Sequence, residues 1–257
     1  MQFWKFEAEG NSYIVVENIN PGSVDIPGIC SKRTGIGSDG LLVAQWLGDN
    51  TVHMRVFNAD GSEAPMCGNG ARCVAAFAYV NKPHLRDEDI VIKAQGATVT
   101  HRLSDTDGMG FNAVIQFERD PLISKHESKP RYQYVVGSPH LVILTDLAFV
   151  DLISDGPREE MTYDGGTNVM FASVIERGII RVLPWERGVG IVEGCATGSA
   201  AAAMAVALEH ADWPMDSDVL TPQGCVRVHW NANERMLSMS GSVSLVAEGS
   251  YFANSAR

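Results

Sequence analysis

The alternation of hydrophobic and polar positions predicts a chain dominated by β-strands. Short apolar runs alternate with turns rich in Gly, Pro, Asn and Asp along both halves, a pattern typical of mostly antiparallel sheets. In the first half the predicted strands are residues 3–7, 12–17, 41–46, 52–57, 90–93, 97–103 and 113–117. In the second half they are residues 132–136, 141–144, 172–175, 179–183, 226–230, 236–241 and 243–248.

One long helix is predicted in each half, and both helices are apolar on every side. They begin at Cys67 and Cys195, and run to about residues 80 and 210. A helix that is hydrophobic all round is normally buried rather than laid on a surface. We therefore predict an α+β fold in which each half is a curled, mostly antiparallel sheet around a central helix.

Three other stretches carry turn-forming residues. Residues 18–32 contain two Pro-Gly pairs, residues 155–157 read Asp-Gly-Pro, and the polar residues 119–131 contain two prolines. Glycine and proline interrupt regular elements. We expect a loop in the first stretch, a break in the second, and the crossing between two domains in the third.

The two helices belong to an internal repeat. Asn58 lies nine positions before Cys67, Glu186 lies nine positions before Cys195, and a strand-like run precedes each. Two further matches stand upstream, residues 10–16 with 137–143 and, more loosely, residues 37–43 with 167–173. Three matches in the same order at near-equal spacing predict two similar domains.

The repeat sets the domain boundaries. We place the N-terminal domain at residues 1–118 and the C-terminal domain at residues 119–248, with residues 249–257 returning to pair with the first domain.

Composition and charge exclude several classes of protein. The formal net charge of −11 over 257 residues argues against a nucleic-acid surface, which needs a basic stripe. The longest apolar run, residues 200–208, is too short to span a bilayer, and residues 1–6 enter a strand pattern rather than a signal segment. The five irregularly spaced cysteines do not resemble a disulfide framework. A cytoplasmic location follows, with a homodimer left open.

The position of the two cysteines suggests chemistry. A helix start has unpaired backbone N–H groups and the positive end of the helix dipole, so it can bind a carboxylate and favour a thiolate. If Cys67 and Cys195 faced one another, they would hold one carboxylate between two sulfurs. One sulfur could then remove a proton from an α-carbon and the other return a proton to the opposite face.

The turns beside these cysteines would stabilise the carbanion. The N–H groups of Gly68 and Asn69, and of Ala196 and Thr197, are already oriented toward a carboxylate that gains charge. Small buried cysteines are also common in cores, and we predict core packing for Cys30, Cys73 and Cys225. No spacing of Cys or His residues indicates a metal site.

Several motifs resemble those of the diaminopimelate epimerase family. They are residues 35–40 (GIGSDG), 58–63 (NADGSE), 67–73 (CGNGARC), 168–169 (NV), 186–188 (ERG) and 195–198 (CATG). The resemblance implies two similar domains with the active site in the cleft between them. It also implies reversible inversion of an amino-acid α-carbon without pyridoxal phosphate or metal. Proline racemase is a relative, but it usually has a histidine where this chain has Asn69.

The resemblance also implies roles for polar residues. Glu186 would meet the reacting ammonium group, Arg187 would pair with a distal carboxylate, and His140 would support the proton chemistry. The amides of Asn11, Asn58 and Asn168 would complete the polar end.

Plainer interpretations stay open for some of these residues. Asn11 could serve only its turn, His140 could be a core histidine, and Glu186 with Arg187 could be a solvated ion pair.

The chain departs from the family pattern mainly in its second half. Ser138 replaces an asparagine that reads the distal end of diaminopimelate, Ala196 replaces a glycine, and residues 191–192 (IV) replace Glu-Thr. In the first half, residues 12–13 (SY) replace Asp-Phe. The cysteine pair is kept while the residues that set specificity are altered.

Four hypotheses follow, in order. The first is a two-cysteine epimerase that converts LL- to meso-diaminopimelate, an isomerase without a cofactor. The second keeps this mechanism but acts on another polar amino acid, as Ser138 suggests. The third is an amino-acid-binding protein without chemistry. The fourth is a thiol-disulfide role for Cys67 and Cys195.

Overall fold

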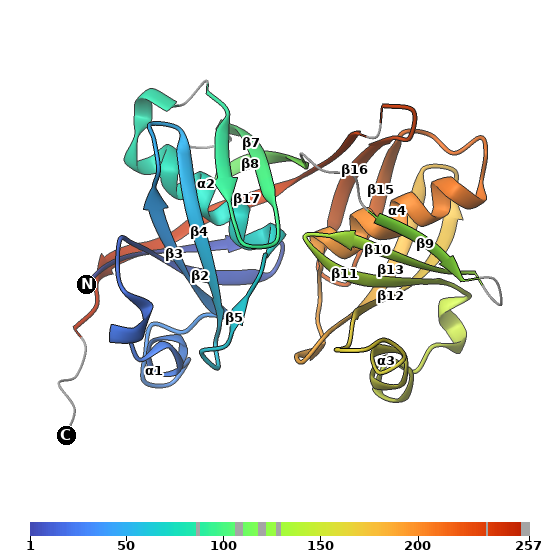
Figure 1. The fold of residues 1–257 in the computed structure, drawn as a ribbon, viewed down its shortest axis with the longest axis horizontal. Coiled ribbons are helices and arrows are strands. Elements are labelled where there is room, and N and C mark those ends of the chain that lie inside the picture. The colour runs from blue at the N-terminus through green and yellow to red at the C-terminus, as the bar shows by residue number, and fades with distance from the viewer. Residues whose placement is uncertain (86–87, 106–109, 118–121, 127–129, 235, 253–257) are drawn as a thin grey trace. The chain divides into compact units, whose positions relative to one another are not determined.

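The computed structural model describes residues 1–85, 88–105, 110–117, 122–126, 130–234 and 236–252 (Figure 1). The chain divides into two compact units, Met1–Glu118 with Ser242–Arg257, and Arg119–Gly241. Strands predominate in both units and most of their pairings are antiparallel. The predicted α+β class with two similar sheets around central helices is confirmed.

The first unit is a sheet that closes on itself around one helix. Its described strands follow the order β1 (Gln2–Ala8), β2 (Asn11–Glu17), β3 (Gly40–Trp46), β4 (Thr51–Asn58), β6 (Ile90–Lys93), β7 (Thr98–Asp105), β8 (Gly110–Phe117) and the second part of β17 (Met236–Ser250), which pairs with β1. The short β5 (Glu63–Ala64) pairs with β4. Inside lies α2 (Gly68–Asn81), buried from Gly68 to Tyr79 (Figure 1).

The second unit repeats this arrangement. Its described strands follow the order β9 (Leu122–His126), β10 (Arg131–Val136), β11 (Ser138–Leu144), β12 (Asn168–Glu176), β13 (Ile179–Glu186), β15 (Asp216–Leu220), β16 (Cys225–Asn231) and the first part of β17, with β14 (Gly190–Ile191) beside β13. The parallel pairs β11–β12 and β13–β15 repeat β2–β3 and β4–β6 of the first unit. The central helix is α4 (Ala196–Glu209), buried from Ala196 to Val206.

Each unit also carries a shorter helix on the other face of its sheet. Alternate residues of a strand point to opposite faces, and Ile14 and Val16 of β2 pack with Ile26 and Ile29 of α1 (Ile26–Cys30). In the second unit, Leu141 and Ile143 of β11 and Val169 and Phe171 of β12 form a hydrophobic cluster, here called the β11–β12 cluster. Leu152 of α3 (Leu152–Glu160) packs on this cluster. Three single 3₁₀ turns complete the described helices: η1 (Pro21–Ser23), η2 (Pro83–Leu85) and η3 (Leu147–Phe149). Within the described ranges, no helix combines the length and apolarity needed to cross a bilayer.

The structure corrects the loop expected in the first turn-rich stretch and the break expected in the second, and it adds a strand to the third. The predicted loop of residues 18–32 contains α1, which Asp25 caps by accepting from the Gly28 N–H at 3.0 Å. The predicted connector of residues 119–131 contains β9, which pairs with β10; residues 119–121 and 127–129 of that connector lie outside the described residues. The predicted break at residues 155–157 lies inside α3.

Two strand predictions and one burial prediction are also wrong. β15 was not expected, and β17 is one continuous strand where two were predicted. The chain returns to the first unit at Ser242, and β17 pairs with β1 from Ser244 onward. Cys30 and Cys73 are buried as expected, but Cys225 is exposed because the alternation of β16 points Val226 inward instead.

The glycine of the mispredicted break has a packing role. An ideal Cβ on Gly156 would lie 2.3 Å from Cε3 of Trp185, which packs on the β11–β12 cluster. Only a residue without a side chain allows α3 to approach the indole this closely.

We predict that Gly156→Ala lowers the free energy of unfolding by about 1–3 kcal/mol, the usual cost of overpacking a well-packed site. Gly48→Ala is the matched control, since its nearest neighbour, the Thr51 Cβ, lies 3.9 Å away. Urea unfolding followed by tryptophan fluorescence measures both. Equal stability of the two variants would contradict this interpretation of Gly156.

Candidate active site

Cys67 caps the buried start of α2. Its backbone is extended (φ −142°), and its Sγ accepts the Gly70 N–H at 3.2 Å. The hydroxyl of Tyr13, on β2, lies 3.0 Å from the same sulfur. Gly68 and Asn69, predicted to bind substrate, form the buried first turn, whose N–H groups have no partner within the helix.

A network of polar contacts holds the side chain of Asn69 in this turn. The Asn69 Nδ2 donates to Asn11 Oδ1 at 2.7 Å, and the Arg72 Nη1 donates to Asn69 Oδ1 at 3.3 Å. Arg72 is fully buried, and Glu9 Oε1 lies 3.7 Å from its Nη1. Burial lowers the pKa of Arg72, and the Glu9 carboxylate opposes this shift. The structure therefore brings Asn11 and Asn69 together in one network.

Asn58 has a local role at the end of β4. Its Nδ2 donates to the Ser62 Oγ at 3.0 Å, and its N–H donates to the Ser62 carbonyl at 2.9 Å. These are turn contacts, and in the described residues no hydrogen bond joins Asn58 to the Cys67 turn.

Cys195 caps α4 in the same way. Its backbone is extended (φ −147°), and its Sγ accepts the Gly198 N–H at 3.3 Å. Ala196 and Thr197 form the buried first turn. A Cβ on Gly198 would lie 2.3 Å from the Met170 Sδ, so a side chain at this position would require Met170 to shift.

His140 lies beside the Cys195 sulfur. Its Nε2 is 3.8 Å from Cys195 Sγ and 3.1 Å from Thr197 Oγ1, which is itself 3.6 Å from the sulfur. Its Nδ1 lies 2.7 Å from the Ser138 carbonyl, which can only accept, so we assign the proton to Nδ1 and a lone pair to Nε2. Burial lowers the pKa of His140 to about 4. A neutral imidazole therefore offers an acceptor to the Cys195–Thr197 pair.

A second group of predicted residues connects to His140 through Asn168. The Asn168 Nδ2 donates to Ser138 Oγ at 3.1 Å and lies 3.4 Å from His140 Nε2, while its Oδ1 accepts the Arg187 N–H at 2.9 Å. The exposed Arg187 side chain donates from Nη1 to the carbonyls of Gly165 and Gly166 at 3.1 and 3.3 Å.

Glu186 ends β13 and is half-buried. Burial raises the pKa of its carboxyl group, which lowers the cost of protonation and makes a cationic ligand favourable nearby. The carboxyl group of Glu186 is half-buried, and the guanidinium of Arg187 donates to loop carbonyls.

Tyr13 is the site residue that sequence reasoning missed. The sequence contained a signal for Tyr13: the repeat aligns residues 10–13 with residues 137–140, so Tyr13 corresponds to His140. The structure repeats this match, since Tyr13 pairs with Gly40 and His140 pairs with Asn168 in corresponding parallel ladders.

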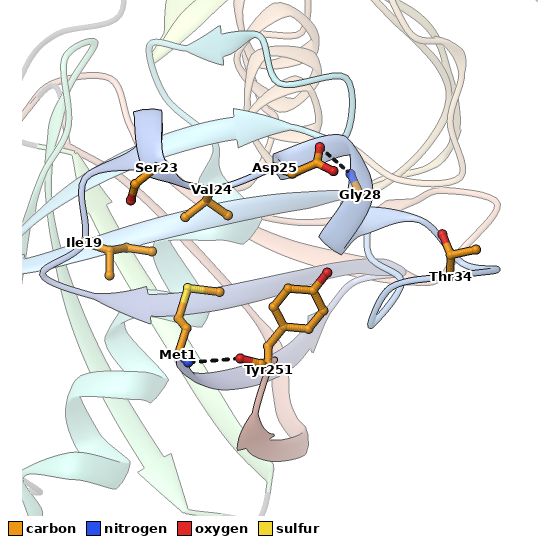
Figure 2. Close-up of a pocket in the computed structure, with 8 residues that line it drawn as sticks. All are labelled: Met1, Ile19, Ser23, Val24, Asp25, Gly28, Thr34 and Tyr251. Atoms are coloured by element: carbon orange, nitrogen blue, oxygen red, sulfur yellow. Dashed lines mark hydrogen bonds between the residues drawn. The ribbon is translucent and has the colours of Figure 1, made fainter. Parts of the chain in front are cut away.

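A cavity of about 360 Å³ lies elsewhere in the first unit (Figure 2). Its described lining includes none of the predicted site residues. Its polar groups serve the fold: the Met1 amine donates to the Tyr251 carbonyl at 3.0 Å, and Asp25 accepts from Gly28 (Figure 2). Cavity size alone does not locate the chemistry.

Comparisons with known proteins identify the family. The diaminopimelate epimerase family profile matches residues 3–115. The diaminopimelate epimerase of Bacteroides thetaiotaomicron is 33% identical to this chain over 97% of each sequence. The chain belongs to the diaminopimelate epimerase family. It is therefore an isomerase, an amino-acid epimerase that acts on a small molecule, and a binding protein without chemistry is no longer supported.

Two solved structures of other epimerases share the fold of this chain. A predicted epimerase from Pseudomonas aeruginosa has a TM-score of 0.73 at 11% identity, covering 98% of this chain and 99% of its own. A hydroxyproline epimerase from Agrobacterium vitis, with bound trans-4-hydroxy-L-proline, has a TM-score of 0.69 at 12% identity and covers 97% and 91%.

We predict that His140 stays neutral until the pH falls to about 4. Its pKa in the folded state lies below the unfolded value of about 6.5, so the unfolded chain binds the extra proton first. This contribution to stability is complete above pH ~6.5 and is lost as the pH falls toward 4. Nitrogen-15 NMR of the imidazole should show Nδ1 protonated at pH 7. A titration near 6.5, or a proton on Nε2 at pH 7, would contradict the assignment.

Proposed function

We propose that this protein inverts an amino-acid α-carbon by two-base proton transfer between Cys67 and Cys195, without pyridoxal phosphate or metal. The leading reaction is the conversion of LL-diaminopimelate to meso-diaminopimelate. The observation that supports it is the paired capping: each unit has a half-buried cysteine at the start of its buried central helix, with Sγ accepting the N–H three residues on.

The helix starts suit the charge that develops. An α-proton is weakly acidic, and its removal moves negative charge onto the substrate carboxylate. The first-turn N–H groups of Gly68 and Asn69, and of Ala196 and Thr197, would donate hydrogen bonds to that carboxylate and stabilise its charge without reorganising.

The cysteines would begin each turnover in different protonation states. A thiolate removes the α-proton on one face, and the thiol of the other cysteine delivers its proton to the opposite face. After inversion the states are exchanged, and proton exchange with solvent resets them. Each turnover therefore needs both sulfurs.

The polar residues of the second unit would hold the rest of the substrate. Glu186, half-buried and with a raised pKa, would pair with the reacting ammonium group. Arg187 is anchored through Nη1 by loop carbonyls, and its remaining donors suit a distal carboxylate. Asn11, Asn58 and Asn168 would add uncharged hydrogen bonds.

The second candidate substrate is another polar amino acid, and Ser138 favours it. Its Oγ accepts from Asn168, so the side chain that would read a distal group is short and already engaged. A fold relative in this superfamily holds trans-4-hydroxy-L-proline, so this architecture is compatible with other substrates.

The central test is replacement of each cysteine. Cys67→Ser and Cys195→Ser should each lower inversion by about 10³-fold or more, because a serine hydroxyl is a far weaker acid than a thiol at these positions. Deuterium uptake at Cα in D2O, followed by mass spectrometry over a panel that includes LL- and meso-diaminopimelate, measures the effect. The exposed Cys225→Ser is the matched control and should retain full activity.

Retention of inversion by either single variant would refute the two-base mechanism. Exchange with another amino acid but not with diaminopimelate would move the assignment to the second candidate.

A second test concerns substrate choice. If diaminopimelate is the substrate, Ser138→Asn should raise its kcat/KM about fivefold, the effect of one added hydrogen bond. Ser138→Ala, which loses the contact with Asn168, is the control and should lower it. Steady-state kinetics on both stereoisomers measures the change. No gain with Ser138→Asn would argue against a distal carboxylate at this position.

A further inference from the structure

The sulfur of Cys67 has a neighbour that differs in kind from the neighbour of Cys195. The phenolic oxygen of Tyr13 lies 3.0 Å from Cys67 Sγ, and the residue is 9% exposed. The same sulfur accepts the Gly70 N–H at 3.2 Å and stands at the positive end of α2.

The sheet register brings the phenol to the sulfur. Tyr13 pairs with Phe6 on one side and Gly40 on the other. An ideal Cβ on Gly40 would lie 3.0 Å from Tyr13 Cε1. The absence of a side chain at Gly40 therefore leaves room for the ring along the strand, in reach of the helix start.

The corresponding residue of the repeat has the opposite hydrogen-bonding character. His140 Nδ1 is committed to the Ser138 carbonyl, so its Nε2 presents a lone pair toward Thr197 and Cys195. A lone pair stabilises a protonated thiol, whereas a phenolic O–H donor stabilises a thiolate.

We propose that Tyr13 is a positioning residue that donates its phenolic hydrogen to Cys67 Sγ and makes Cys67 the thiolate of the resting protein. This inference rests on the proposed function and adds its starting state. Cys67 loses its proton to solvent on forming the thiolate, and the substrate α-proton then forms the new S–H bond on Cys67. Cys195 gives its thiol proton to the carbanion and becomes the thiolate. Tyr13 keeps its proton throughout.

The Tyr13→Phe variant is the sharpest change available. It removes one oxygen and keeps the ring, and phenylalanine is the residue that the family usually has here, so the fold should be preserved. Circular dichroism and the Tm check this. Tyr79→Phe is the matched control: it removes another buried hydroxyl of the same unit, one that donates to the Leu103 carbonyl at 3.5 Å.

The readout is the rate of iodoacetamide alkylation at each cysteine from pH 5.5 to 9.5, resolved by mass spectrometry of peptides. The pH at which the Cys67 rate reaches half of its maximum should be about one unit higher in Tyr13→Phe than in the wild type, so that on the acid side of both midpoints the rate is about tenfold lower. The Cys195 rate should stay within twofold, as should both rates in Tyr79→Phe. The acid limb of kcat/KM against pH should move up by a similar amount.

A rise of less than about half a unit in the half-maximal pH of Cys67 alkylation in Tyr13→Phe would overturn the inference. So would an equal shift at Cys195, which marks a general structural effect. Alkylation needs no substrate, so the two proposals fail separately. A Cys67-specific effect without inversion of diaminopimelate would leave Tyr13 in its role and remove the substrate assignment. Inversion without that effect would remove the role of Tyr13 alone.

Discussion

Each unit depends on burying the beginning of a helix that has no polar face. α2 and α4 are enclosed from their first residues, so the N–H groups of their first turns are withdrawn from water and must find acceptors. In both units a cysteine sulfur accepts one of these groups. A group that serves as a cap is thereby placed at the positive end of a helix, beside N–H groups that can bind an anion. Structural and chemical requirements meet on the same residue.

The two units share the same backbone arrangement around their cysteines, but the side chains that contact the two sulfurs differ. Parallel ladders of the same register place Tyr13 beside one sulfur and His140 beside the other. The supporting networks differ as well, since the first is built on the buried cation of Arg72 and the second on the neutral amide of Asn168. In the proposed two-base mechanism, inversion exchanges the protonation states of the two cysteines, and different neighbours would favour one of these states at rest.

Periodicity and the repeat predicted the features that local physics controls. The apolar helices begin at Cys67 and Cys195 because a small-residue turn leads into an all-apolar run. The helix α3 was missed because its glycine is needed for close packing on Trp185, which turn statistics do not contain. Tyr13 was missed for a similar reason: its contact with Cys67 joins residues 54 positions apart, and only the repeat pointed to it. The described contacts of Asn58 are those of a turn, so its role toward the substrate stays a prediction.

The central claim is that the sulfurs of Cys67 and Cys195 transfer protons at the same α-carbon. Linking the two sulfurs in a disulfide tests this claim most directly. Mild oxidation with diamide of the Cys225→Ser protein, followed by digestion and mass spectrometry without reduction, should yield a disulfide-linked pair of peptides containing Cys67 and Cys195. Activity should fall in proportion and return with reductant, and saturating substrate should slow the linkage. Oxidation that modifies the two cysteines separately, with no linked peptide and no protection by substrate, would contradict the account.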